Sequence, residues 1–362
     1  MIKLLVVDDS ALVRKLLGQV FGGEPDFEVR FARNGVEALE QLKPFAPDVI
    51  TLDVHMPQMD GLACLDRIMI ERPCPVVMVS SLTAEGAEAT LEAFRLGAID
   101  FVPKPEGTVS LHIEDLAPEL IAKVRSAAGA KLKSSLRLAD RVRHRIGGAG
   151  GLGPRRRVGV ATEPDTLREP PTGEGLVLVG TSTGGPPALE ALLKPLPADF
   201  PWPILVAQHI PASFTGPLAK RLNGICALNV VEVLKPTPLE AGTVYIGRGD
   251  ADLIVTRRAG RLTAMAAPSE AGYPWHPSTD RLVRTAMQHL PAGQLIGVLM
   301  TGMGDDGATA MAQMHAEGGQ TIAESEETAV VWGMPGELVK AKGADWVLPL
   351  PSIAARLQKL TP

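Results

Sequence analysis

The sequence predicts an α/β protein in which two doubly wound, mainly parallel domains are joined by a flexible linker. Apolar runs of strand length alternate with helical patterns in both halves of the chain, whereas the middle is rich in glycine, proline and basic residues. A length of 362 residues suits two or three domains of ~150 residues each. A hydrophobic content of 45% excludes wholesale disorder. We expect a first domain over residues 1–127, a linker over 128–172 and a second domain over 173–362.

The central segment lacks the apolar periodicity of a folded element. The net charge of −5 hides a strongly basic run between residues 131 and 157, where nine lysines and arginines accompany a single acid. The same run contains GGAGGLGP, and PDTLREPPTGEG follows it. Glycine, proline and charge without periodicity are typical of linkers. No aromatic residues interleave with the basic run, so we expect a solvated linker and no nucleic-acid partner.

The sequence carries no sign of a membrane segment or of an oxidising compartment. The N-terminal MIKLLVVDDS has too short an apolar run for a signal peptide, and no segment holds the ~20 apolar residues that span a bilayer. The cysteines are odd in number and lack metal-ligand spacing. We therefore expect a cytoplasmic protein without membrane insertion, with free thiols at Cys64, Cys74 and Cys226.

Residues 1–127 show a regular alternation of strand-like and helical patterns, which predicts a parallel sheet covered on both faces. The strand-like runs include KLLVVDD, VITLDV, PVVMVSS and AIDFVPKP. In such sheets the functional residues gather at the carboxyl ends of the strands. The polar side chains expected at that edge are Asp8, Asp9, Asp53, Ser80 and Lys104.

Three carboxylates at one edge repel each other unless a cation joins them. Mg²⁺ suits such a place, because it prefers a couple of carboxylates together with water and phosphate oxygens. A carboxylate beside Mg²⁺, with a lysine and a hydroxyl to hold phosphoryl oxygens, can attack a phosphoryl donor. The first half is therefore predicted to accept a phosphoryl group.

This half resembles a response-regulator receiver domain through VVDDS, TLDVHMPQMDG, MVSSLTAEG and DFVPKP, in that order. The resemblance implies a flavodoxin-like fold, Mg²⁺ as a cofactor and a histidine kinase as the phosphodonor. It also suggests a cis peptide bond before Pro105. The residues it assigns are the phosphoacceptor Asp53, the metal ligands Asp8, Asp9 and Asp53, and the switch residues Ser80, Phe101 and Lys104.

The second half opens with the apolar strand LVLVG and the turn GTSTGG, which fits the pattern G-x-S-x-G around Ser182. Glycine permits a tight strand–turn–helix geometry, and the prolines that follow suit a helix start. Such a turn can hold a nucleophilic serine or cradle a phosphate. No Gly-Lys-Ser/Thr follows, as a Walker loop requires, and G-x-G-x-x-G is absent. The nucleophile interpretation then depends on finding a base and an acid.

Two other strand ends supply a candidate base and a candidate acid. His209 ends the apolar run PILVAQH, and the run QLIGVLM leads into TGMGDDG with Asp305 and Asp306. If these strands are parallel neighbours of the strand before Ser182, all three groups meet at one sheet edge. The chain order Ser, His, Asp differs from that of α/β-hydrolases, but a triad is defined by its geometry. His276, in a proline-flanked loop, is the alternative base.

Residues 173–362 resemble the CheB-type protein-glutamate methylesterase domain through VGTSTGGPPAL, VAQHIPASFT, HPSTDRL and LMTGMGDDGA. Together with the receiver, the resemblance implies a phosphorylation-activated serine esterase of chemotaxis adaptation. Its substrates would be glutamate methyl esters, and glutamines for deamidation, on chemoreceptors. The residues it assigns are Ser182 as nucleophile, His209 as base, Asp306 as orienting acid, and Thr183 and Met303 at the oxyanion site.

The chain departs from that family at two positions beside the expected site. Thr181 stands where alanine is usual, which exchanges one small side chain for another. Asp305 stands where asparagine is usual, which puts a second carboxylate beside Asp306. The alternative function is a catalytically inactive, receiver-linked signalling module. No helix-turn-helix or RNA-binding pattern follows the receiver to support a nucleic-acid output.

Overall fold

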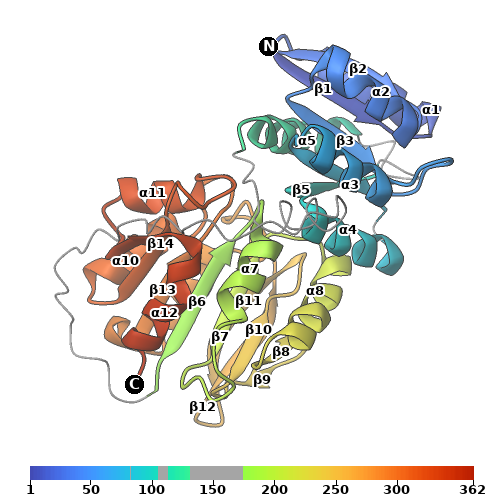
Figure 1. Ribbon diagram of the computed structural model, residues 1–362. Coiled ribbons are helices and arrows are strands. Elements are labelled where there is room, and N and C mark those ends of the chain that lie inside the picture. The colour runs from blue at the N-terminus through green and yellow to red at the C-terminus, as the bar shows by residue number, and fades with distance from the viewer. Residues whose placement is uncertain (82, 105–112, 131–173) are drawn as a thin grey trace, which may run out of the picture.

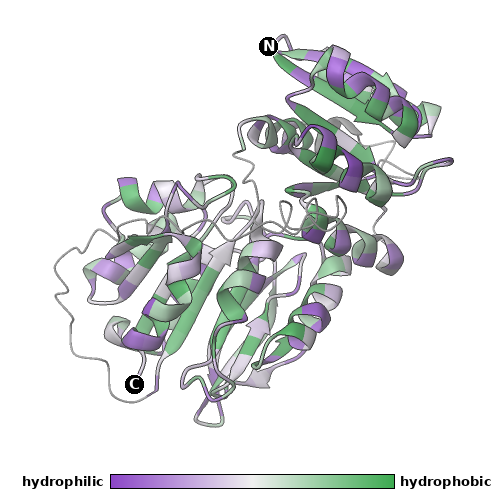
Figure 2. Ribbon diagram, viewed as in Figure 1, coloured by the Kyte–Doolittle hydropathy of each residue, from purple (hydrophilic) through white to green (hydrophobic). Residues whose placement is uncertain are grey.

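The computed structural model describes residues 1–81, 83–104, 113–130 and 174–362 of the chain. These residues form two α/β units, the N-terminal unit in blue to teal and the C-terminal unit in green to red in Figure 1. None of the helices in these ranges is long and apolar enough to cross a bilayer. The central strands are hydrophobic along their length in Figure 2, whereas the helices mix hydrophobic and hydrophilic residues.

The N-terminal unit is a five-stranded sheet in the order β2-β1-β3-β4-β5, with every neighbouring pair parallel. Its strands are β1 (Ile2–Val7), β2 (Phe27–Ala32), β3 (Val49–Asp53), β4 (Val76–Ser80) and β5 (Asp100–Pro103). Its helices are α1 (Ala11–Gly22), α2 (Gly35–Phe45), α3 (Gly61–Glu71), α4 (Ala84–Leu96) and α5 (Ile113–Ala128).

Burial on both faces explains why the strands of the N-terminal unit are continuous apolar runs. In β1, Leu5 and Val7 belong to one hydrophobic cluster, and Leu4 and Val6 belong to another. Four of the helices begin at a side-chain cap that accepts a hydrogen bond from a backbone N–H in the first turn. These caps are Ser10, Asn34, Asp60 and Thr83.

The C-terminal unit is built on a seven-stranded parallel sheet in the order β15-β14-β13-β6-β7-β10-β8. Its strands are β6 (Leu176–Thr181), β7 (Ile204–Gln208), β8 (Asn229–Glu232), β10 (Thr243–Ile246), β13 (Leu295–Leu299), β14 (Gln320–Glu324) and β15 (Trp346–Leu348). A small antiparallel sheet in the order β11-β12-β9 contains β9 (Thr237–Pro238), β11 (Ala251–Arg258) and β12 (Arg261–Pro268).

Helices connect the strands of the large sheet and cover its faces (Figure 1). They are α7 (Gly185–Leu193), α8 (Ala212–Ile225), α9 (Thr279–Met287), α10 (Ala308–Ala316), α11 (Met334–Lys340) and α12 (Leu350–Leu360), with the short 3₁₀ helix η2 (Ala292–Gln294). The helix α7 is the predicted crossover between the strands that precede Ser182 and His209. Its first turn contains prolines, which have no N–H to leave unpaired there.

The predicted fold class is confirmed: a flavodoxin-like parallel sheet is followed by a mainly parallel α/β domain. The small antiparallel sheet was not predicted. The domain limits stay predictions, because most of the expected linker and Pro105 lie outside the described residues. One cis peptide bond occurs in the described chain, between His276 and Pro277.

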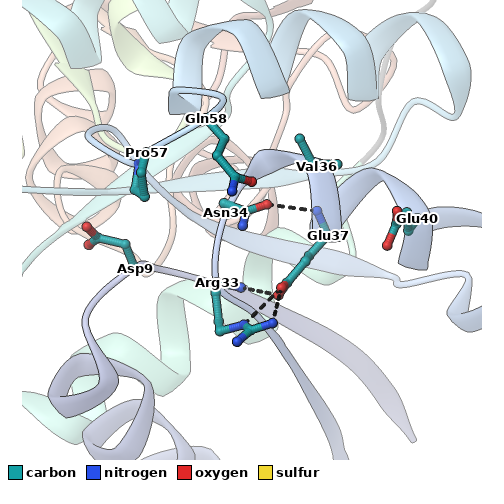
Figure 3. Close-up of a pocket in the computed structure, with 8 residues that line it drawn as sticks. All are labelled: Asp9, Arg33, Asn34, Val36, Glu37, Glu40, Pro57 and Gln58. Carbon is teal, nitrogen blue, oxygen red and sulfur yellow. Dashed lines mark hydrogen bonds and ion pairs between the residues drawn. The ribbon is translucent and has the colours of Figure 1, made fainter.

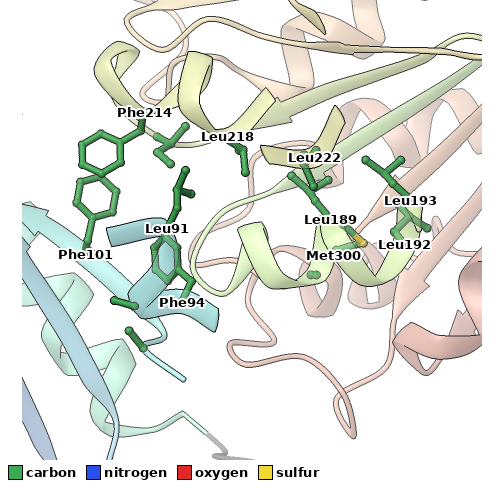
Figure 4. Packing of buried hydrophobic residues seen from close by; sticks show 14 of the residues in the cluster. Leu91, Phe94, Phe101, Leu189, Leu192, Leu193, Phe214, Leu218, Leu222 and Met300 are labelled. Carbon is green, nitrogen blue, oxygen red and sulfur yellow. The ribbon is translucent and has the colours of Figure 1, made fainter. Parts of the chain in front are cut away.

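The two units pack against each other through β5 and α4 of the first and α7 and α8 of the second. Phe101 of β5 stacks on Phe214 of α8, with ring centroids 4.3 Å apart and ring planes 27° apart. Figure 4 shows this pair beside Leu91 and Phe94 of α4 and Leu218 of α8, and one buried hydrophobic cluster contains all five residues. The N-terminal unit therefore shares a hydrophobic core with the C-terminal unit.

Candidate active site and phosphorylation site

The carboxyl edge of the receiver sheet brings together the acidic residues that the sequence singles out. Carboxylate oxygens of Asp8, Asp9 and Asp53 all lie within 4.8 Å of one another. The Lys104 ammonium lies 2.9 Å from an oxygen of Asp53 and 3.6 Å from an oxygen of Asp8. Asp8 and Asp53 are buried, and Asp9 is exposed.

The charge balance of this cluster favours a divalent cation. Burial raises the pKa of Asp8 to about 6, the neighbouring Asp53 charge adds to the effect, and Lys104 opposes it. Burial also raises the pKa of Asp53, against the lowering effect of Lys104. The Oδ2 atom of Asp8 has no hydrogen-bond partner among the described residues. The three carboxylates share the positive charge of the Lys104 ammonium, which is too small to balance them. Such an acidic cluster of hard oxygen ligands is typical of a Mg²⁺ site.

A surface pocket of about 560 Å³ opens beside Asp9 (Figure 3). Arg33 and Glu37 lie on its wall as an ion pair, and Asn34 caps the helix start there. The pocket gives the acidic cluster an open side. Two of the switch residues lie at the same sheet edge as the acidic cluster: Lys104 contacts Asp53, and Ser80, at the end of the neighbouring strand β4, is buried and donates to the carbonyl of Gly86.

In the second domain the strand order makes β13, β6 and β7 neighbours. Ser182, His209 and Asp306 follow the carboxyl ends of these three strands, so the candidate nucleophile, base and acid lie at one edge. The loops are tied to each other by backbone hydrogen bonds. Ser182 donates to the carbonyl of Thr301 at 3.0 Å, and His209 donates to the carbonyl of Thr181 at 3.1 Å.

The turn after Ser182 requires glycine at two positions. Gly184 has φ of +77°, a conformation that a side chain disfavours. A Cβ atom on Gly185 would lie 1.9 Å from the Gln208 side-chain oxygen. The same Gln208 donates to the Ser182 carbonyl at 3.0 Å. Glycine thus lets the start of α7 approach β7 closely and holds Ser182 at the strand end.

Asp306 is the better-connected member of the acidic pair after β13. It is 4% exposed, whereas Asp305 is exposed. Its carboxylate accepts from the Ser278 hydroxyl at 2.9 Å and from the Thr279 N–H at 2.6 Å. Burial raises the pKa of Asp306, but hydrogen bonds from His209 and from the start of α9 outweigh burial and leave the pKa below its usual range. Asp306 is therefore ionised at neutral pH.

His209 is held by this carboxylate through one ring nitrogen. Its Nε2 lies 2.8 Å from Asp306 Oδ2, and because a carboxylate only accepts, Nε2 carries the proton. The opposite nitrogen, Nδ1, is buried and has no hydrogen-bond partner among the described residues. His276, the alternative base, instead binds the buried Asp252 through Nδ1 at 2.9 Å. The neutral tautomer of His209 thus leaves a free lone pair at Nδ1.

The two residues expected at the oxyanion site lie beside Ser182. Met303 follows Gly302, where an added Cβ atom would come within 2.9 Å of the Ser182 Cβ. Thr183 is buried, and its hydroxyl donates to the Asp100 carboxylate of the receiver. The backbone N–H of Gly184 also donates to the N-terminal unit, where the carbonyl oxygen of Ile99 accepts it at 2.9 Å. The receiver thus holds the turn that carries Ser182.

Sequence reasoning missed three residues that the structure brings to this site. Asp100 binds the Thr183 hydroxyl, and its signal was an acid inside the apolar run AIDFV. Trp275 stacks on His209, with ring centroids 5.3 Å apart. Asp252 is a fully buried carboxylate that ties the loop before α9 to β11. No local pattern identifies the partners of these residues, because each partner is distant in sequence.

The fold and the geometry define a class: a response regulator whose receiver domain is joined to a mainly parallel α/β esterase domain. Residues 4–114 match the family model described as response regulator receiver domain, and residues 177–357 match the model described as CheB methylesterase. The second domain is similar to the crystal structure of the Thermotoga maritima CheB methylesterase catalytic domain. That similarity has a TM-score of 0.51 and 35% identity, and covers 52% of this chain and 100% of that one.

Whole-chain relatives point to the same family. The chain is 59% identical over 358 residues to protein-glutamate methylesterase/protein-glutamine glutaminase 2 of Rhodopseudomonas palustris, a match that covers 98% of this chain and 97% of the relative. It is 51% identical over 357 residues to protein-glutamate methylesterase/protein-glutamine glutaminase 3 of Rhodospirillum rubrum, covering 99% and 95%. The chain therefore belongs to the CheB family of protein-glutamate methylesterases/protein-glutamine glutaminases.

Proposed function

We propose that this CheB-family methylesterase and glutaminase acts on chemoreceptors through Ser182, His209 and Asp306, under the control of phosphorylation at Asp53. The observation that carries the proposal is the 2.8 Å contact between His209 and Asp306 at the end of the strand next to Ser182. Membership in the family indicates the acyl substrates, and the geometry at the strand ends supports the roles of these three residues.

In the proposed reaction, Ser182 Oγ attacks the carbonyl carbon of a glutamate methyl ester while His209 Nδ1 takes the hydroxyl proton. The tetrahedral intermediate then collapses as His209 gives that proton to the departing methoxide, which leaves as methanol. Water, activated by the same nitrogen, hydrolyses the acyl-enzyme and releases free glutamate and Ser182. With a glutamine side chain, ammonia leaves in place of methanol.

Charge stabilisation accompanies each proton transfer. The ionised Asp306 keeps the His209 proton on Nε2 and stabilises the imidazolium that forms when Nδ1 is protonated. The Thr183 hydroxyl and the N–H of Met303 would donate to the oxyanion, and such donors are commonly worth ~3 kcal/mol each. Because the hydroxyl of Thr183 now donates to Asp100, this donor becomes free only when the receiver moves away.

The receiver is proposed to take a phosphoryl group on Asp53 from a histidine kinase of a chemotaxis system. Asp8, Asp9 and Asp53 would hold Mg²⁺, which offsets the charge of the carboxylates and of the incoming phosphoryl oxygens. Lys104, now 2.9 Å from Asp53, would bind one of those oxygens. The Oδ2 atom of Asp8 accepts no hydrogen bond among the described residues, although the Lys104 ammonium lies 3.6 Å away, and this atom and the raised pKa of Asp8 support the assignment.

Phosphorylation is proposed to activate the enzyme by releasing the receiver from the turn around Ser182. Phosphoryl oxygens would draw Ser80 toward Asp53, and Phe101 would then leave its stack on Phe214. The equilibrium between bound and released receiver shifts when phosphorylation changes the relative stability of the two states by only a few kcal/mol. In the structure the receiver is bound to the second domain, an arrangement that we call the contact state, and Ser182 is 8% exposed in it. Release would expose Ser182 and free the hydroxyl of Thr183.

Mass spectrometry of a methylated chemoreceptor, treated with phosphorylated enzyme, tests the proposed base. Wild type should convert glutamate methyl esters and glutamines to glutamate at the receptor sites. His209→Gln should lose both conversions by several orders of magnitude, because triad members act as a unit. His276→Gln, at the alternative base, removes a contact of the loop before α9 with Asp252 and should lose far less activity than His209→Gln. Loss with His276→Gln and retention with His209→Gln would reject the proposed base.

A further inference from the structure

The loop between β12 and α9, residues 269–278, covers one face of the His209 ring. Trp275 in this loop lies nearly parallel to the imidazole, with ring centroids 5.3 Å apart and planes 8° apart. Such offset-parallel packing is a favoured geometry for aromatic pairs. His209 therefore has two constraints: a hydrogen bond at Nε2 and an indole along its face.

The position of Trp275 is fixed by a buried anchor directly after it in the chain. Asp252 of β11 is fully buried and accepts from Nδ1 of His276 at 2.9 Å and from the N–H of Ser278 at 2.8 Å. Arg281 of α9 donates to the other carboxylate oxygen at 2.6 Å. These contacts secure the chain on the C-terminal side of Trp275, so the indole has a defined location and is no loose surface side chain.

The indole also reaches the loop that carries the expected oxyanion donor. A Cβ atom on Gly304 would lie 3.6 Å from the indole Nε1, and Gly304 directly follows Met303. Trp275 thus lies against the base and against the loop after β13 at the same time. A hydrogen bond at Nε2 alone leaves the ring free to tilt, whereas a parallel neighbour fixes its plane and the direction of Nδ1.

We propose that Trp275 is a positioning residue for the base: it holds the His209 ring in the plane in which Nδ1 faces Ser182. The proposal rests on the function proposed above, because it assumes that His209 acts on Ser182. A misplacement of about 1 Å at a reacting group can cost about 100-fold in rate. Loss of the indole should therefore lower kcat by about 10- to 100-fold with KM little changed.

The other role that the structure offers Trp275 is a wall for the protein substrate. A pocket of about 580 Å³ beside the acidic pair is lined by Trp275, Tyr273 and Arg284 among other residues. A residue that only binds the receptor would raise KM for the receptor and leave hydrolysis of a small ester unchanged. A positioning residue lowers kcat for both substrates equally, so the two roles are separable.

The first experiment measures kcat and KM of Trp275→Leu and Trp275→Phe with a methylated receptor and with the γ-methyl ester of an N-acetylated glutamate. Phe keeps an aromatic face, whereas Leu fills space without one. Trp275→Leu should lose about 10- to 100-fold in kcat on both substrates, and Trp275→Phe should recover most of it. Trp346→Leu, at a partly buried tryptophan on the edge strand β15, is the control for the loss of an indole.

Wild-type kcat for Trp275→Leu on the small ester would overturn the proposal. That result would leave the proposed function intact, since the function fails only if Ser182→Ala or His209→Gln retains activity. A loss confined to KM for the receptor would also overturn it and would make Trp275 a substrate contact.

The second experiment detects the ring contact without turnover. A protonated imidazole quenches an indole that it touches, so the Trp275 fluorescence, taken as wild type minus Trp275→Phe, should fall as His209 is protonated. The charged groups around the pair are Asp306 after β13, Asp280 at the start of α9, whose charge acts on Asp306, and the neighbouring His276. The pocket that Trp275 lines also contains the charged side chains of Asp305, Arg284 and Glu270. The pH-dependent quenching should vanish in His209→Gln and persist in His276→Gln. Identical titration curves for wild type and His209→Gln would overturn the proposal.

Discussion

Replacing Asp100 by alanine should switch the esterase on without phosphorylation. The Asp100 side chain is 7% exposed at the start of β5 and accepts the hydroxyl of Thr183 across the domain interface. Its other oxygen accepts from the N–H of the adjacent Phe101 at 2.8 Å. The substitution therefore removes a charge-assisted contact with the second domain and leaves the remaining receiver core in place.

The size of the effect follows from that one hydrogen bond. Without the carboxylate, the Thr183 hydroxyl is buried and unpaired in the contact state, but it is solvated once the receiver has moved away. A hydrogen bond to a charged group is worth about 1.5–3 kcal/mol, and every 1.4 kcal/mol is a factor of ten. The ratio of released to contact state should therefore rise about 10- to 150-fold. The rate of methanol release cannot rise further once the receiver is released in every molecule.

The assay is methanol release from methylated receptor by the full-length, unphosphorylated chain. Asp100→Ala should approach the rate of phosphorylated wild type and of a fragment that begins near residue 173. Glu28→Ala, on the opposite edge strand β2, removes a carboxylate far from the interface and should stay at the basal rate. A basal rate for Asp100→Ala beside a fast fragment would refute the claim that this contact restrains the enzyme.

Three further predictions follow from the contacts described. Asp306→Asn should lower kcat by about 10³- to 10⁴-fold and Asp305→Asn by about twofold at most, and the reverse ranking would show that the acid is misassigned. Asp8 has a pKa raised from 3.8 to about 6, so its neutral form stabilises the receiver at low pH and this stabilisation is lost as pH rises toward 6. Asp8→Asn should therefore raise the free energy of unfolding in urea by up to ~3 kcal/mol near neutral pH without Mg²⁺, and a gain of the same size below pH ~4 would contradict this origin. Gly185→Ala should lower the free energy of unfolding by about 1–3 kcal/mol because of the Gln208 contact, whereas Gly224→Ala, inside α8 and with no atom within 4 Å of the added methyl group, should leave it unchanged or raise it by up to ~1 kcal/mol.

The parallel sheets were predictable because their strands are buried on both faces and end in polar residues. The run LVLVG before Ser182 shows both features. The strand β2 gave a weaker signal, since several of its side chains, such as the exposed Phe31, face solvent or only partly enter the core. The sequence argument only assumed that β6, β7 and β13 are neighbouring strands, and the observed strand order satisfies this assumption.

Contacts between distant segments could not be predicted. Asp100 and Thr183 are far apart in the chain and lie in different domains, so no spacing rule links them. The stacking of Trp275 on His209 depends on the loop that the buried Asp252 anchors, and neither residue belongs to a strand-end pattern. The catalytic and phosphorylation roles of the sequence-predicted residues stay predictions, now with defined geometry.

Methanol release by phosphorylated Ser182→Ala tests the central claim most directly. The measurement uses a methylated receptor, the full-length chain and wild type as the reference, with circular dichroism to show that the variant is folded. The account predicts that wild type releases methanol and leaves glutamate at the receptor sites, whereas Ser182→Ala releases none above the uncatalysed rate. Methanol release by folded Ser182→Ala at a rate near that of wild type would contradict the account.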